Sequence, residues 1–332
     1  MYNKSLKYFT LALVITFAFI SCKNEPKNIT IKQEVIKVPS FNKKEAYQYV
    51  KTQVDFGPRV PNTEAHQYCK DWIISEMGKT KFNIIEQNFE AKTYDDKTLN
   101  STNIIVQYKP ELKKRILLMA HWDTRFISDA ESDEDKQNLA VHGADDGASG
   151  VAVLISIANA IKTEDLSMGV DFVFFDAEDQ GESKGTDNTT WCLGSQYWAN
   201  NLHIKGYKAE FGILLDMVGS KNARFMPEYW STIYAPQANI KVWKTAFQMG
   251  YANLFVKGKP RPVTDDHYFV NTIAGIPSID IINTTDKGTG FGAHWHTQND
   301  NMDIIDKNTL KAVGSVILNV LYKEAKGKIK AY

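Results

Sequence analysis

The sequence of 332 residues predicts an α/β fold, a three-layer sandwich in which helices flank a central mixed, mostly parallel sheet. Two observations predict it. Six strand-like runs alternate with segments of helical periodicity, which is typical of chains that build a sheet with helices packed on its faces. Several of these runs are continuously apolar, as expected for strands that are buried on both faces of a sheet.

The expected strands are residues 83–89, 103–108, 115–120, 170–175, 212–215 and 278–282. Three expected helices are marked by apolar residues that recur at helical spacing. These are Tyr68, Trp72, Ile73 and Met77; Leu154, Ile157, Ala158 and Ile161; and Val313, Val316, Ile317, Val320 and Leu321. The first of these helices is expected to begin at Asn62-Thr63, because both residues are good helix caps.

The composition indicates a globular protein whose main partner is not nucleic acid. Hydrophobic residues make up 43% of the chain and charged residues 23%, which is typical of a folded domain. Lysine plus arginine and aspartate plus glutamate number 39 each, so the chain has no net basic field with which to attract a polyanion.

The N-terminus has the layout of a bacterial secretion signal. Lys4 and Lys7 precede an apolar run over residues 11–20, which is short for a transmembrane helix and ends at Ser21-Cys22. Residues 19–22 resemble a lipobox, in which Cys22 becomes the lipidated first residue of the mature protein. An ordinary signal peptide or a short anchor is the alternative.

The predicted organisation is therefore a lipoprotein signal peptide over 1–22, a flexible polar tether over 23–40 and a single catalytic domain over 41–332. This organisation predicts an exported lipoprotein that faces the periplasm and contacts the membrane only through its lipid. Cys69 and Cys192, the remaining cysteines, could pair in an exported protein or stay free.

Acidic residues follow three of the predicted strands. Asp123 follows the run 115–120, Glu178 and Asp179 follow 170–175, and Asp216 ends the run that starts at 212. Asp146 precedes a predicted helix whose first turn includes Gly147. Because ligands of open α/β sheets bind at the carboxyl ends of strands, these acids are expected to meet at one site.

Three of the candidate residues suit a catalytic zinc ion. Asp146, Asp179 and His296 supply two carboxylates and an imidazole, and a catalytic zinc keeps three protein ligands and one open position. Glu178 is a neighbouring carboxylate that need not bind the metal and could move protons. His294 is interpreted as non-ligating.

Structural interpretations compete with these functional ones. Asp145 and Asp146 could cap the following helix, and Asp265 and Asp266 could cap another, although Asp265 could equally hydrogen-bond the site. His121 and Asp216 could bind a second metal or only support the first. The acidic stretch 128–135 is interpreted as a solvated loop, with a position at the mouth of the pocket as the alternative.

The motifs HWD, GADDGASG, FFDAED, LLD, DDH and WHT occur in an order that resembles the zinc-dependent aminopeptidase superfamily and, within it, the glutaminyl cyclases. The resemblance spans about residue 41 to the C-terminus. It implies one zinc held by Asp146, Asp179 and His296. Asp179 stands where animal cyclases and the aminopeptidases carry glutamate, and aspartate is also a good zinc ligand.

The resemblance also implies a substrate and an acid–base group. Peptides or proteins that begin with glutamine would be cyclised, with Glu178 as the proton carrier and with Asp265 and Asp216 hydrogen-bonded to it. A substrate pocket formed by aromatic side chains is implied at Trp191, Phe291 and Trp295.

Two alternatives remain open from the sequence. A two-zinc aminopeptidase would use His121 and Asp216 as additional ligands, with Asp146 bridging the metals. A non-catalytic, peptide-binding lipoprotein would keep the fold without the reaction. The sequence does not decide between one and two metals, and it leaves the oligomeric state open.

Overall fold

The computed structural model describes residues 36–285 and 290–327. The predicted signal peptide, Cys22 and residues 23–35 of the predicted tether lie outside this part of the chain. Residues 36–40, the predicted end of the tether, form no helix or strand, yet Ile36 and Val38 pack against the hydrophobic core. None of the helices in the described part is both long and apolar enough to cross a bilayer.

The central sheet confirms all six predicted strands. They are β1 (Asn83–Lys92), β2 (Thr98–Tyr108), β3 (Arg115–His121), β4 (Gly169–Phe175), β5 (Phe211–Asp216) and β6 (Ser278–Ile282). Their order in the sheet is β1-β2-β4-β3-β5-β6. The pairs β1–β2 and β2–β4 are antiparallel, whereas β4–β3, β3–β5 and β5–β6 are parallel. The sheet is therefore mixed and mostly parallel, as predicted.

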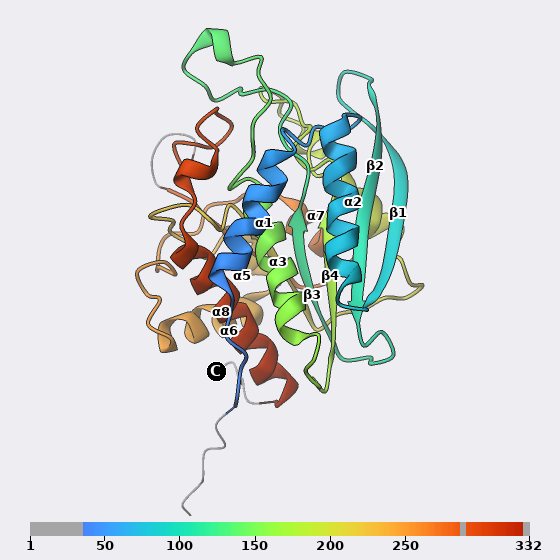
Figure 1. Ribbon diagram of the computed structural model, residues 1–332, viewed down its shortest axis with the longest axis vertical. Coiled ribbons are helices and arrows are strands. Elements are labelled where there is room, and N and C mark those ends of the chain that lie inside the picture. Colours follow the sequence, from blue (N-terminus) through green and yellow to red (C-terminus); the bar gives the residue numbers. More distant parts are fainter. Residues whose placement is uncertain (1–35, 286–289, 328–332) are drawn as a thin grey trace, which may run out of the picture. The chain divides into compact units, whose positions relative to one another are not determined.

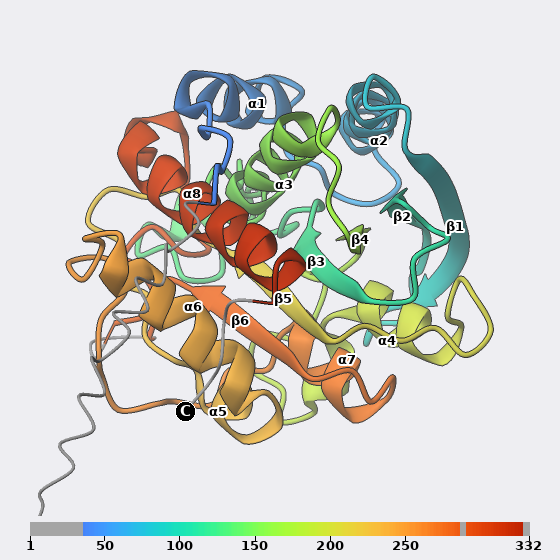
Figure 2. The ribbon, with the colours of Figure 1, turned by 90° about the horizontal axis from the view of Figure 1, so that it is seen from below.

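Helices cover both faces of the sheet (Figures 1 and 2). One face carries α1 (Lys43–Asp55), α2 (Glu64–Gly78), α3 (Ala148–Ile161) and α8 (Lys307–Ala325). The other carries α4 (Leu193–Asn200) and α7 (Asp266–Thr272), while α5 (Tyr229–Tyr234) and α6 (Pro236–Gln248) pack near β6. Short 3-10 helices span Glu134–Lys136, Asn188–Thr190 and Met302–Ile304.

Alternating side chains of each central strand fill two separate cores. In β3, Leu118 belongs to the core beneath α3 and α8, and its neighbours Leu117 and Met119 belong to the core beneath α4 and α7. All of these side chains are fully buried. The predicted apolar runs arise because successive strand residues point to opposite faces and both faces are covered.

Helix α2 begins as predicted but buries a different stripe. The Thr63 side chain caps it by accepting a hydrogen bond from the His66 backbone N–H at 3.3 Å. Tyr68, which was assigned to the buried stripe, is 56% exposed, and Cys69 takes its place with Ile73 and Met77. The prediction was wrong by one position, because a free cysteine is a small apolar side chain that fits the close contact between helix and core.

The close packing of α3 on the sheet depends on Gly150. A Cβ atom at this residue would lie 2.2 Å from the carbonyl oxygen of Leu215 in β5 and 3.0 Å from the Cβ atom of Ala120 in β3. We expect Gly150→Ala to lower the free energy of unfolding by about 1–3 kcal/mol, because α3 must move away from backbone that cannot yield.

The matched control is Gly78→Ala at the end of α2, where an added Cβ would meet no atom within 4 Å. This control should leave stability unchanged or raise it by about 0.5–1 kcal/mol, since alanine is the better helix former. Urea unfolding of both variants measures the difference. Equal stability of the two would show that α3 does not depend on this contact.

Candidate functional site

The predicted acidic residues meet at the carboxyl ends of the central parallel strands. His121 is the last residue of β3, Asp216 is the last residue of β5, and Glu178 and Asp179 follow β4. Asp146 lies two residues before the start of α3. With the exception of His121, all of these side chains line one cavity of about 370 Å³, and His296 lines it as well.

The proposed zinc ligands lie together in this cavity. His296 Nε2 is 3.1 Å from Asp179 Oδ1 and 3.9 Å from Asp146 Oδ2. One candidate ligand atom from each of the three residues lies within 4.8 Å of the other two, and all three residues are buried. Two carboxylates and one imidazole gathered away from water form a donor set that fits zinc.

The orientation of His296 is set by Asp129, which the sequence analysis did not single out. His296 Nδ1 lies 2.8 Å from Asp129 Oδ1, and Arg125 donates to the other oxygen of Asp129 at 2.9 Å. Burial raises the pKa of Asp129, but the bond to His296 and the charge of Arg125 outweigh it and lower the pKa overall. Asp129 therefore stays ionised and directs His296 Nε2 towards the candidate ligand set.

This contact corrects the interpretation of residues 128–135 as a solvated loop. Asp133 to Asp135 are exposed, but Ser128 and Glu131 are buried. The charge pattern could not separate Asp129 from its exposed neighbours, because its partner lies 167 residues further along the chain.

Asp123 holds the turn that carries Glu178 and Asp179. Its carboxylate accepts hydrogen bonds from the backbone N–H of Glu178 at 3.0 Å and of Asp179 at 3.2 Å, and from the side-chain amide of Gln180 at 2.9 Å. Asp123 is fully buried. It thus fixes the backbone of the turn. Asp123 lies at the site, as predicted, and its role there is to support the turn.

Asp300 plays the same part for the turn before α3. It accepts hydrogen bonds from the backbone N–H of Asp145 at 2.7 Å and of Asp146 at 3.1 Å. Asp145 contacts His294 Nε2 at 2.9 Å and accepts from the backbone N–H of Gly219 at 2.6 Å. The N-cap of α3 is Gly147 and has no side-chain cap, so the capping alternative for both aspartates is wrong.

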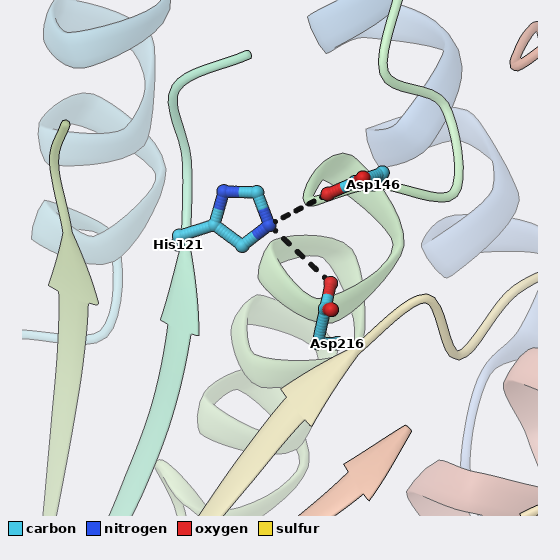
Figure 3. A group of neighbouring side chains, drawn as sticks. All are labelled: His121, Asp146 and Asp216. Carbon is cyan, nitrogen blue, oxygen red and sulfur yellow. Dashed lines mark hydrogen bonds and ion pairs between the residues drawn. The ribbon is translucent and has the colours of Figure 1, made fainter. Parts of the chain in front are cut away.

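A second group of candidate metal ligands shares Asp146 with the first (Figure 3). His121 Nε2 lies 2.9 Å from Asp146 Oδ1 and 3.3 Å from Asp216 Oδ1. Burial, followed by the charge of Asp146, raises the pKa of Asp216 well above its ordinary value. The structure therefore brings together both the one-metal set and the two residues that would extend it to two metals.

Glu178 lies beside both groups and makes a contact that the sequence did not indicate. Its Oε1 accepts a hydrogen bond from the thiol of Cys192 at 3.2 Å, and its Oε2 lies 4.0 Å from His121 Nδ1. Burial raises the pKa of Glu178 well above its ordinary range. The charge of His121 opposes this rise, and the charges of Asp179 and Asp265 add to it.

Asp216 and Asp265, predicted to hydrogen-bond Glu178, make other contacts. Asp216 faces His121, and Asp265 caps α7 by accepting from the backbone N–H of Asp266 at 2.6 Å. The second oxygen of Asp265 is buried without a hydrogen bond, and a carboxylate oxygen of Asp265 lies within 4.8 Å of one of Glu178. Asp265 therefore both caps α7 and lines the cavity.

The three predicted aromatic residues all line the cavity. The Trp295 ring stacks on His296 with 3.7 Å between centroids, and Phe291 lies 4.8 Å from Trp295. Trp191 packs over Gly181, where an added Cβ would come within 2.1 Å of the indole. The glycine that ends the motif FFDAEDQG is therefore needed for the indole to reach the cavity wall.

Both described cysteines, Cys69 and Cys192, are free and buried. The disulfide left open by the sequence does not form in the described part of the chain. The thiol of Cys192 instead donates a hydrogen bond to the carboxylate of Glu178.

Residues 103–321 match the profile of peptidase family M28. The chain is similar to the solved glutaminyl cyclase of Bacteroides thetaiotaomicron bound to N-acetylhistamine, with 47% identity, a TM-score of 0.84 and coverage of 86% of this chain and 99% of that one. A Zn-dependent exopeptidase from Parabacteroides distasonis shows 46% identity, a TM-score of 0.84 and the same coverage. The glutaminyl-peptide cyclotransferase of Dictyostelium discoideum is 23% identical and covers 94% of this chain and 97% of that protein.

The matched residues include every strand that contributes to the cavity and all three candidate zinc ligands. The chain therefore belongs to peptidase family M28 and is a relative of the bacterial glutaminyl cyclases.

Proposed function

We propose that this protein is a glutaminyl-peptide cyclotransferase, which converts an N-terminal glutamine of peptides or proteins to pyroglutamate and releases ammonia. The observation that carries the proposal is the position of Glu178, a carboxylate whose side chain is 12% exposed, beside a candidate zinc site in a cavity lined by aromatic residues. The similarity to bacterial glutaminyl cyclases supports the same activity.

The residues that would hold one zinc ion are Asp146, Asp179 and His296. The ion would supply a Lewis acid for the side-chain amide carbonyl of the substrate glutamine. The relationship to a Zn-dependent exopeptidase supports zinc as the metal.

In the proposed reaction Glu178 accepts a proton from the α-amino group of the substrate. The amino nitrogen then forms a bond to the δ-carbon, the carbonyl carbon of the side-chain amide, which closes a five-membered ring, and the bond from that carbon to the side-chain amide nitrogen breaks. Glu178 returns the proton to this nitrogen, which leaves as ammonia. Because both reacting groups belong to one residue, correct positioning supplies much of the acceleration.

The surrounding side chains shape this reaction in two ways. Trp191, Phe291 and Trp295 line the cavity and would enclose a glutamine side chain and limit the access of water, which would otherwise hydrolyse the polarised amide. Asp265 raises the proton affinity of Glu178 through its charge. Asp216 holds His121, whose Nδ1 faces Glu178 at 4.0 Å.

A two-zinc aminopeptidase is the second candidate, because His121, Asp146 and Asp216 form a further ligand group and one relative is a Zn-dependent exopeptidase. A protein that binds peptides without transforming them is the third.

We expect the purified protein to release ammonia from a glutamine-initiated peptide and to leave a leucine-initiated peptide intact, as followed by mass spectrometry. Glu178→Gln should lower kcat by about 10²- to 10⁴-fold with little change in KM, because the proton carrier is lost. Glu182→Gln, an exposed glutamate in the same loop, is the matched control. Release of leucine would establish the aminopeptidase, and the absence of both reactions would support the binding protein.

The number of metals is tested by elemental analysis of the purified protein and two variants. His296→Ala should remove zinc and activity together, because it deletes one of the three candidate ligands. His121→Ala should leave one zinc per chain, because His121 belongs only to the second group. Two zinc ions in the parent protein and one in His121→Ala would identify a two-metal site.

We also propose that the protein is an exported lipoprotein anchored through Cys22 and facing the periplasm. The proposal rests on the charged start, the apolar run and the small residue before Cys22. In cells supplied with labelled fatty acid, the parent protein should carry the label and Cys22→Ala should not. Equal labelling of both proteins would contradict the anchor.

A further inference from the structure

The thiol of Cys192 is fixed opposite the carboxylate of Glu178 by the backbone. The backbone N–H of Cys192 donates to the carbonyl oxygen of Glu178 at 2.8 Å, and that of Leu193 donates to the carbonyl of Ala177 at 3.0 Å. Cys192 itself has φ 57° and ψ 37°, a left-handed conformation that is uncommon for residues other than glycine. The two segments are therefore joined at the position where the side chains meet.

The side-chain contact is one hydrogen bond. Cys192 Sγ lies 3.2 Å from Glu178 Oε1, and the cysteine is fully buried. Burial and the nearby charge of Glu178 raise the pKa of the thiol well above its ordinary value, so the sulfur keeps its proton. A protonated thiol can donate to a carboxylate, and it is a poor nucleophile.

The two oxygens of Glu178 are thereby distinguished. Oε1 accepts the hydrogen bond from the thiol, whereas Oε2 lies 4.0 Å from His121 Nδ1. Several neighbouring groups are acidic, including Asp179 and Asp265, and repel the carboxylate rather than hold it. A neutral hydrogen-bond donor can fix the rotation of the Glu178 carboxylate without neutralising the charge of that carboxylate.

We propose that Cys192 is a positioning residue for the proton carrier: its S–H group holds Oε1 of Glu178 and leaves Oε2 to exchange the proton with the substrate. This inference rests on the proposed function, in which Glu178 moves the proton. It assigns a role to a cysteine that takes part in no disulfide within the described part of the chain.

The kinetic test compares Cys192→Ala, Cys192→Ser and the control Cys69→Ala in the full-length protein on a glutamine-initiated peptide. Cys69 is the other buried, free cysteine and packs in the core beneath α2. Cys192→Ala should lower kcat about tenfold with KM nearly unchanged, the effect of losing one hydrogen bond to a charged group. Cys192→Ser should recover most of kcat, since its hydroxyl also donates, and Cys69→Ala should match the parent.

A packing role predicts a different pattern, in which alanine and serine are equally impaired and both lower thermal stability. That pattern, or a wild-type kcat in Cys192→Ala, would overturn the inference. A parent protein that is inactive on glutamine-initiated peptides would instead refute the proposed function, so the two failures are distinguishable.

Infrared spectroscopy tests the hydrogen bond between Cys192 and Glu178 independently of enzyme activity. The S–H stretching band that disappears in Cys192→Ala should lie at lower frequency than the band that disappears in Cys69→Ala, because a donated hydrogen bond weakens the S–H bond. Glu178→Leu should shift the Cys192 band to higher frequency. Identical bands for the two thiols, or no shift in Glu178→Leu, would show that the thiol does not hold Glu178.

Discussion

The site depends on keeping many carboxylates buried at one edge of the sheet. Burial and mutual repulsion both oppose their ionisation, so the backbone must hold them in place. Two fully buried aspartates, Asp123 and Asp300, hold the turns that carry candidate ligands. Asp123 accepts hydrogen bonds from the backbone N–H groups of the turn after β4, and Asp300 accepts them from those of the turn before α3. Each carboxylate thereby fixes the backbone of a turn that carries one candidate zinc ligand.

The opposite edge of the same strands shows the contrast. There Arg115, the first residue of β3, makes two bonds to Asp171 of β4, at 2.6 and 2.7 Å, and the Tyr207 hydroxyl donates to the same carboxylate at 2.6 Å. At this edge the buried aspartate is matched by a cation and by donors, as stability requires. At the carboxyl edge the acids outnumber the cations, and this excess of negative charge suits a metal ion.

Asp146 is shared by the two candidate ligand groups. It belongs to the group with Asp179 and His296 and to the group with His121 and Asp216. The proposed cyclase and the alternative aminopeptidase would therefore share the fold, the base and the first metal. They would differ in whether the second group binds a metal and in whether water reaches the amide, and the aromatic residues that line the cavity would act on the access of water.

The sequence by itself determined the fold class, all six strands and the three candidate ligands, the neighbouring acids and the aromatic residues that line the cavity. Apolar runs on buried strands, acids at strand ends and glycines in tight turns are local patterns, so they can be read along the chain. It did not show which turns are strained: Ala177 (φ 53°), Met217 (φ 49°) and His296 (φ 54°) all adopt a left-handed conformation beside or within the site. None is glycine, and the strain is sustained by the surrounding structure.

Only the tertiary structure decided the partners of the site residues. Asp129 lies 167 positions from His296, and Asp300 lies 155 positions from Asp145. The thiol of Cys192 reaches Glu178 only because the turn after β4 is folded against the start of α4. A hydrogen bond depends on where two chain segments cross in space, and no periodicity or spacing in the sequence specifies that crossing.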